Sequence, residues 1–245
     1  MGVNDNGFIR GLVGPLVNRK VGDKNYVQSR PKPVKQKEDT KKAGREFGTV
    51  SRAGALIRTY LSEIHQQLHD GQMGNRLNRQ IYRAIKTNLD REKGSRTLSN
   101  CVLDRLVNFQ FNENCPTQDY LFIDPAISLS KKKKLKVSFP EFDMKRAMIL
   151  PKRCNAIVFK FQAFAFNFDQ LRSVVIQDTE WEYDVKYKEN IIPEKSLSIA
   201  CGDFVGSSIF VGFTILYLAK DRRRPNILNE KDFNPASILT AFQLE

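Results

Sequence analysis

Apolar residues recur every three or four positions between residues 48 and 112, which is the spacing of one helix face. The apolar positions of the first stretch are Ala53, Ile57, Tyr60, Leu61, Ile64 and Leu68. After an interruption at Gly71 and Gly74, those of a second stretch are Leu77, Ile81, Ile85 and Leu89. Ser95 can cap a third stretch that runs from Leu98 to Val107. The pattern therefore predicts two or three helices that pack antiparallel.

From about residue 118 the apolar period changes to two, which is the period of a half-buried strand. The clearest example is the alternation of Trp181, Tyr183, Val185 and Tyr187 with Glu180, Glu182, Asp184 and Lys186. We expect the aromatic set to face a core and the carboxylates to face solvent. Six or seven such segments, separated by turn residues, predict an antiparallel, Ig-like β-sandwich over residues 116–245.

One segment shows two apolar phases in succession. Ile157, Phe159 and Phe161 share one phase, whereas Phe164, Phe166 and Phe168 share the other. This change at Gln162 and Ala163 predicts a β-bulge, or a corner at which the strand changes sheets.

The first 47 residues lack such periodicity and combine glycines with a run of Lys and Pro. Gly22 and Asp23 are suited to a hairpin turn. Alternating prolines at Pro31 and Pro33 favour an extended backbone. We therefore predict an α+β protein with a basic extended arm at 1–47, a helical segment at 48–115 and the sandwich at 116–245.

Length and hydropathy narrow the setting of the protein. The longest apolar stretch, residues 209–219, is interrupted by Gly212 and Thr214 and is too short to span a bilayer as a helix. The first ten residues hold no apolar segment of the kind found in secretory signals. We therefore expect a cytoplasmic protein without a membrane span.

Charge distinguishes the two halves of the chain. The formal net charge is +13, with 20 Lys and Arg against 9 Asp and Glu in residues 1–100, but 12 against 12 in residues 151–245. A basic half joined to a neutral, Phe-rich half is typical of a binding protein whose partner is a polyanion.

Three groups of cations are the candidate binding residues. They are Arg19, Lys20, Lys24, Arg30, Lys32 and Lys35 in the arm, Arg76, Arg79, Arg83 and Lys86 along one helix face, and the run Lys131, Lys132, Lys133 and Lys134. Such cations can neutralise phosphates and release counterions. The alternative is that they are solvated faces that contribute only to solubility.

Catalytic and metal-binding patterns are weak. His65 and His69 have the spacing of two metal ligands on a helix, but Gln66 stands where the metalloprotease signature has Glu, and we expect a solvated face. The four cysteines form no close pair, which disfavours structural zinc and fits small buried residues in a reducing compartment. We predict no enzyme activity, no cofactor and no metal.

The segment from Gly7 to Lys32 resembles the opening of an uncharacterised bacterial family found in Bacteroidota. That family begins with a Gly-rich G-x-x-G-K-V-G-like segment, followed by an apolar hairpin and an R-x-x-P-K-like exit. The residues that carry the likeness are Gly11, Gly14, Gly22, Arg30, Pro31 and Lys32, whereas Pro15 replaces the family's usual Lys. The resemblance implies a helical middle and a β-rich C-terminal half, and it implies no activity.

The sequence thus predicts a non-enzymatic binding or assembly protein that docks on nucleic acid or on a nucleoprotein assembly. The alternative is a structural subunit of a homo-oligomeric particle or filament, phage-derived or cellular, whose arm adds a strand to a neighbouring subunit. Salt distinguishes the two, because it weakens phosphate contacts far more than apolar strand exchange.

Overall fold

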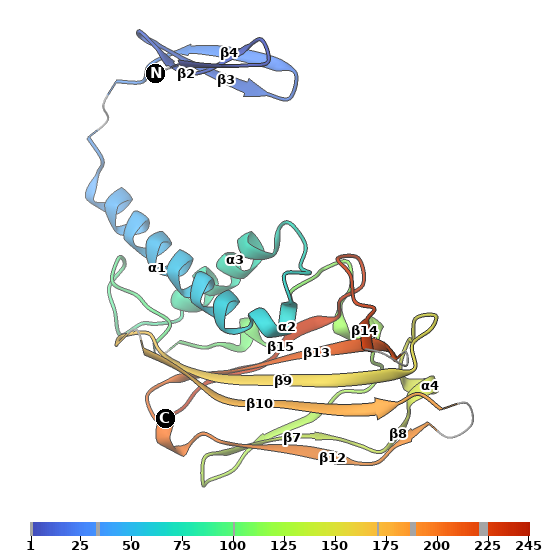
Figure 1. Cartoon of the computed structure of the whole chain (residues 1–245). Helices are drawn as coiled ribbons and strands as arrows, with labels where there is room; N and C mark the ends of the chain where they lie inside the picture. The colour runs from blue at the N-terminus through green and yellow to red at the C-terminus, as the bar shows by residue number, and fades with distance from the viewer. Residues whose placement is uncertain (1, 33–34, 100, 171, 187–189, 221–224) are drawn as a thin grey trace. The chain divides into compact units, whose positions relative to one another are not determined.

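The computed structural model describes residues 2–245 apart from 33–34, 100, 171, 187–189 and 221–224. Contacts divide the chain into two compact units, Met1–Lys41 and Lys42–Glu245. Helices and several antiparallel sheets are present, as Figure 1 shows, so the predicted α+β class is confirmed.

The first unit is a four-stranded antiparallel sheet whose strands lie in chain order. They are β1 (Gly2–Asp5), β2 (Phe8–Val13), β3 (Leu16–Val21) and β4 (Lys24–Ser29). Two-residue turns join them, each with a glycine at positive φ: Gly7, Gly14 and Gly22. The hairpin predicted at Gly22 and Asp23 is therefore confirmed.

An extended arm is the wrong description of this segment. The turns at Gly7 and Gly14 add two further strands to the predicted hairpin, and only the residues after Ser29 leave the sheet before α1 begins. In the part of this unit that the structure describes, no apolar side chain is buried. The usual periodicity of a half-buried strand is therefore weak here, which is why the sheet was not predicted.

Three helices come next along the chain: α1 (Glu38–Tyr60), α2 (Ser62–His65) and α3 (Met73–Ile85). All but the first four residues of α1 belong to the second unit. Helix α1 starts ten residues before the predicted helical segment, and acidic residues Glu38 and Asp39 in its first turn favour that start. None of the helices in the described ranges is both long and apolar enough to cross a membrane.

The third helix predicted after Ser95 is wrong. Apart from the short 3-10 helix η1 (Asp104–Leu106), the described residues between 95 and 107 are irregular. Leu98 and Leu106 are nevertheless buried, because an irregular loop can deliver apolar side chains to a core at helix-like spacing. Leu89 is 86% exposed because α3 ends at Ile85.

A six-stranded antiparallel sheet forms the centre of this unit. Its strands, in spatial order, are β10 (Arg172–Asp184), β9 (Ala156–Asn167), β13 (Ser208–Lys220), β15 (Ala236–Gln243) and β5 (Phe109–Gln110), with β14 (Pro225–Ile227) paired to β13. The helices cover one face of the sheet, and a smaller sheet covers the other (Figure 1).

Strand β9 explains the two apolar phases. Its pairing with β13 runs without interruption, so the predicted bulge in this strand is wrong; the register shift opposite Ala163 lies in β10, between Val175 and Gln177. Phe159 and Phe161 pack toward the smaller sheet, whereas Phe164 and Phe166 pack against the helices. Both faces of this central strand are covered, so both alternating sets are apolar.

The smaller sheet has the order β12 (Lys195–Ala200), β7 (Lys134–Phe139) and β6 (Ala126–Leu129). The remaining elements are β8 (Phe142–Asp143), which pairs with β11 (Ile191–Ile192), helix α4 (Met144–Ala147), and the 3-10 helices η2 (Thr117–Asp119) and η3 (Gly202–Phe204). The described part of residues 116–245 thus contains ten strands rather than six or seven, because short strands such as β8 and β11 carry little periodicity.

The two sheets enclose one core, as the sheets of a sandwich do, but the strand order does not confirm an Ig-like connectivity. The predicted faces of β10 are confirmed for the residues that are described. Trp181 is 5% exposed within the core and Tyr183 packs against it, whereas Glu182 is 52% exposed. Tyr187 lies outside the described residues.

Candidate functional site

The predicted cations of the N-terminal segment belong to the first unit. Arg19 and Lys20 lie on β3 and Lys24 on β4, while Arg30, Lys32 and Lys35 lie in the segment that follows the sheet. All are exposed except Lys20, whose ammonium sits 4.0 Å from the centre of the Phe8 ring. Their role as polyanion contacts stays a prediction.

Arg76 is not a surface cation. Its side chain is only 13% exposed, and its guanidinium forms an ion pair with Asp70, which is 12% exposed. It also donates a hydrogen bond of 3.0 Å to the carbonyl of Gln110 and lies 3.3 Å from a carboxylate oxygen of Glu113. These contacts tie helix α3 to the loop before it and to strand β5, so Arg76 is not the free exposed cation that we expected, and its role in polyanion binding stays a prediction.

The other side of this ion pair is equally well satisfied. Burial alone would raise the pKa of Asp70, but hydrogen bonds from the Glu113 backbone, the Arg76 side chain and the Gln72 backbone together lower it. The ion pair is therefore a structural contact that holds in the folded state.

Arg79, Arg83 and Lys86 remain as an exposed row. They are spaced four and three residues apart, so they share one face of α3 and its C-terminal end. The Lys86 ammonium lies 4.5 Å from the centre of the Tyr82 ring. Helix α3 contains no acidic residue, and no acidic side chain within the described ranges pairs with these three cations.

A fourth cation, which the sequence did not single out, extends this row. Arg105 of η1 lines a cavity of about 320 Å³ together with Arg76, Arg79 and Gln80 of α3. Glu113 also lines the cavity but is paired with Arg76. Arg105 lies 26 residues from Arg79 in sequence and outside any charge run, so only the fold brings the two together. We call Arg79, Arg83, Lys86 and Arg105 the α3 cation row.

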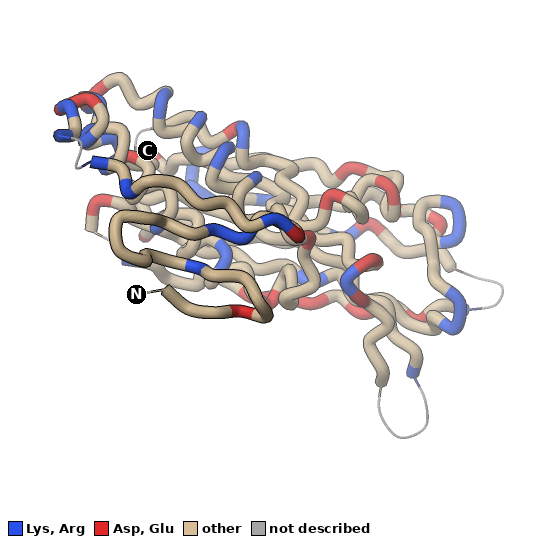
Figure 2. Tube along the Cα trace, turned by 90° about the horizontal axis from the view of Figure 1, so that it is seen from above, with Lys and Arg blue, Asp and Glu red and all other residues tan. Residues whose placement is uncertain are grey.

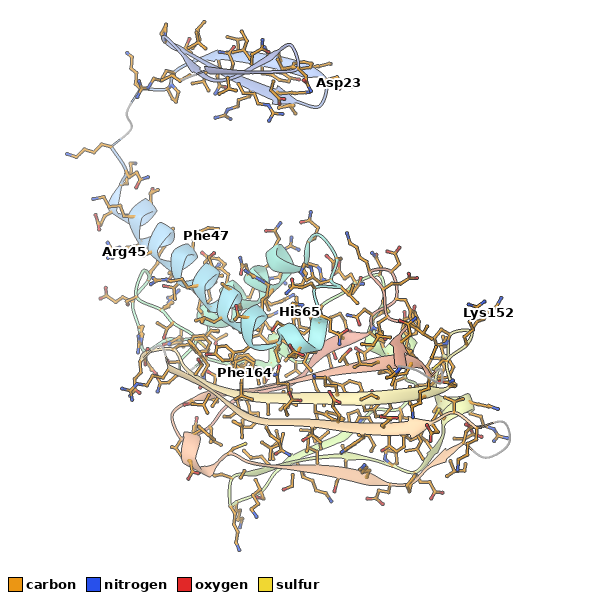
Figure 3. All side chains as sticks on the ribbon, in the orientation of Figure 1. Asp23, Arg45, Phe47, His65, Lys152 and Phe164 are labelled. Atoms are coloured by element: carbon orange, nitrogen blue, oxygen red, sulfur yellow. The ribbon has the colours of Figure 1, made fainter. Side chains whose placement is uncertain are left out.

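A second cavity adjoins the row. It measures about 380 Å³ and is lined by residues of α1 and α3: Ala43, Phe47, Val50, Asn75, Asn78, Arg79 and Tyr82. Arg79 lines both cavities, so the two share a wall. Figure 3 shows Phe47 projecting from α1 on the side opposite Arg45.

The lysine run lies elsewhere. Lys131, Lys132 and Lys133 form the turn between β6 and β7, and Lys134 begins β7. This hairpin belongs to the smaller sheet, which packs on the face of the six-stranded sheet opposite to the helices. The run and the α3 cation row therefore lie on different sides of the second unit. Basic and acidic residues also intermix along the tube in Figure 2, so net charge alone does not locate a site.

The histidine pair is not a solvated helix face. Helix α2 ends at His65, which is 2% exposed and bonds through Nε2 to the Arg58 carbonyl and through Nδ1 to the Gln67 amide. Burial lowers the pKa of His65. Among the described residues, no group of three or more His, Cys, Asp or Glu side chains could hold a metal ion.

The carboxylates of β10 are paired. Glu180 lies 3.1 Å from Lys160, and Lys220 contacts Glu182 and Asp184. These ion pairs explain why three carboxylates can share one sheet face.

Comparison of the chain with models of known protein families and with curated proteins gives no match.

Proposed function

We propose that this protein binds nucleic acid, or the exposed nucleic acid of a nucleoprotein assembly, through the α3 cation row. The single observation that supports the proposal is the row itself: four exposed cations on α3, at its C-terminal end and on η1 that no acidic side chain of the described residues neutralises. Elsewhere in this unit, Lys220 and the half-buried Arg91 pair with carboxylates. A row of unneutralised cations favours a polyphosphate partner because binding releases counterions.

The proposal assigns no catalytic residue, cofactor or metal. Burial raises the pKa of all four cysteine thiols, that of Cys101 to about 11, so none is a ready nucleophile at neutral pH. The His65 ring is occupied by backbone hydrogen bonds. We propose a cytoplasmic location, which fits the four free cysteines because a reducing compartment keeps thiols unpaired.

A salt titration tests the proposal. Fluorescence anisotropy measures the binding of labelled oligonucleotides to the full chain and to the variant R79Q/R83Q/K86Q/R105Q. If each cation neutralises one phosphate, the variant lowers the slope of log K against log salt by about 3 to 4. Equal affinity and equal slope for the two proteins would overturn the proposal. A matched control is K131Q/K132Q/K133Q/K134Q, which removes the same charge from the opposite sheet.

The second candidate function is assembly through the first unit. Its sheet leaves β1 and β4 as outer strands and exposes large apolar side chains: Val3, Ile9, Val13, Leu16, Val21, Tyr26 and Val27. An isolated sheet of this size gains stability by covering such side chains, which favours a neighbouring copy as a partner. Light scattering after gel filtration tests this candidate. An oligomer of the full chain that persists in high salt, together with a monomer of a chain lacking residues 1–37, would support this candidate. A monomer in both cases would refute it.

A further inference from the structure

The cavity between α1 and α3 combines aromatic rings, amide side chains and an adjoining cation. The helices touch where Gly54 of α1 meets Asn78, since a β-carbon at Gly54 would clash with the Asn78 side-chain oxygen. On the N-terminal side of this contact a groove opens along Phe47 and Val50. We call this space, of about 380 Å³, the α1–α3 groove.

Two aromatic rings border the groove. Phe47 is 65% exposed, although its neighbour Val50 is buried. Tyr82 carries Lys86 over its ring. Covering the exposed Phe47 ring with a flat apolar surface is favourable because it removes apolar area from water. The exposed Phe47 ring offers a face on which a planar group can stack.

The polar groups of the groove point to the chemistry of that planar group. Two amide side chains, Asn75 and Asn78, line it, and no carboxylate does. An aliphatic side chain placed there would leave buried amide groups without hydrogen bonds. A nucleobase presents both an apolar face and an edge of donors and acceptors, which suits asparagine.

The neighbouring charges suit the rest of a nucleotide. Arg79 lines the groove and also the cavity that contains Arg105. A base in the groove therefore has cations on the adjoining wall, where its phosphate would lie. We infer that the groove binds an unpaired nucleobase, and that the nucleic acid taken by the α3 cation row is single-stranded. The inference rests on the proposed function and narrows its partner.

The test compares three labelled 12-nucleotide probes of one sequence: a single strand, its duplex, and a strand in which central nucleotides are abasic. The abasic strand keeps every phosphate and loses only bases. We expect the single strand to bind tightest and Phe47→Ala to weaken its binding roughly 5- to 150-fold, which is the range for loss of one stacked base. The salt slope should not change, because no charge is removed.

Two further variants control for folding and for general apolar exposure. Phe47→Tyr keeps the stacking face and should retain binding. Leu89→Ala removes an apolar side chain that is 86% exposed but lies outside the groove, and it should bind as the natural chain does. Equal melting temperatures for the Phe47 variants establish that the groove remains formed.

The outcomes separate this inference from the proposed function. If the abasic strand binds as well as the intact strand, or if Phe47→Ala has no effect, the inference is overturned, while a slope change in R79Q/R83Q/K86Q/R105Q still supports the proposed function. If no oligonucleotide binds, both fail. If instead an acidic amphipathic peptide binds in a Phe47-dependent manner and the oligonucleotides do not, the groove belongs to a protein partner and the inference is overturned.

Discussion

Replacing Arg76 by Gln should destabilise the protein, although Arg76 belongs to the same sequence run as Arg79. The change removes an ion pair whose two side chains are 13% and 12% exposed, and a hydrogen bond of 3.0 Å to the Gln110 carbonyl. Loss of one partner from a buried ion pair costs about 3–5 kcal/mol. Asp70 keeps backbone hydrogen bonds from Gln72 at 2.7 Å and Glu113 at 3.1 Å, which reduces the loss. We expect Arg76→Gln to lower the free energy of unfolding by about 2–4 kcal/mol.

Urea unfolding at neutral pH measures this loss, because urea is uncharged and does not screen ion pairs. The matched control is Arg79→Gln, an exposed position on the same helix, which should stay within about 0.5 kcal/mol of the natural chain. A double-mutant cycle with Asp70→Asn isolates the pair. An Arg76→Gln protein as stable as the Arg79→Gln protein would refute the reasoning.

The same pair makes a prediction about pH. The pKa of Asp70 is lower in the folded state than its ordinary value of 3.8. Its contribution to stability is therefore complete above the unfolded pKa and is lost as pH falls through the folded pKa. The difference in stability between the natural chain and Arg76→Gln should narrow in that acidic range. A difference that stays constant down to pH 2 would contradict the assignment.

Three other perturbations have definite expectations. Trp181→Ala should cost roughly 3–5 kcal/mol, and the natural Trp181 should show blue-shifted fluorescence that iodide quenches poorly, since the side chain is 5% exposed; red-shifted, quenchable emission would contradict its burial. The pKa of His65 is lowered in the folded state, so below about pH 6.5 the unfolded state binds a proton that the folded state does not bind. The free energy of unfolding should therefore fall with decreasing pH by up to ~1.4 kcal/mol per pH unit. His65→Gln should flatten this fall, and an unchanged pH profile would exclude His65 as its source. Deleting residues 1–37 should leave the melting temperature of the second unit nearly unchanged. Deleting residues 1–47 should lower that temperature, because Glu46 is buried and accepts a hydrogen bond of 3.0 Å from the Gly94 amide. Equal melting temperatures for the two truncated chains would show that this contact contributes nothing to stability.

Some of these features were readable from the sequence because they depend on local periodicity. The spacing of Leu77, Ile81 and Ile85 follows one buried helix face, and the alternation at Trp181 follows one buried strand face. In both cases one side of the element meets a core and the other meets water, which is the condition under which hydrophobic pattern reports structure. The Gly22 hairpin was equally local, since a positive φ at a two-residue turn favours glycine.

Other features could not be predicted from local periodicity, for physical reasons that differ between elements. Strand β9 is a central strand covered on both faces, so both of its alternating sets of side chains are apolar. In the sequence, these two sets look like one set that changes phase. The first unit buries no described apolar side chain, so its strands show little alternation, and the turn at Asn6 and Gly7 is the main local signal of its first hairpin.

The candidate site shows the same division. Sequence alone determined that Arg79, Arg83 and Lys86 share a helix face, because that relation depends only on helix geometry. Only the tertiary structure decided that Arg76 is neutralised by Asp70, that Arg105 joins the row, and that Phe47 borders a groove beside it. Each of these depends on side chains brought together from different elements, and the charge of a residue does not reveal which other residue folds against it.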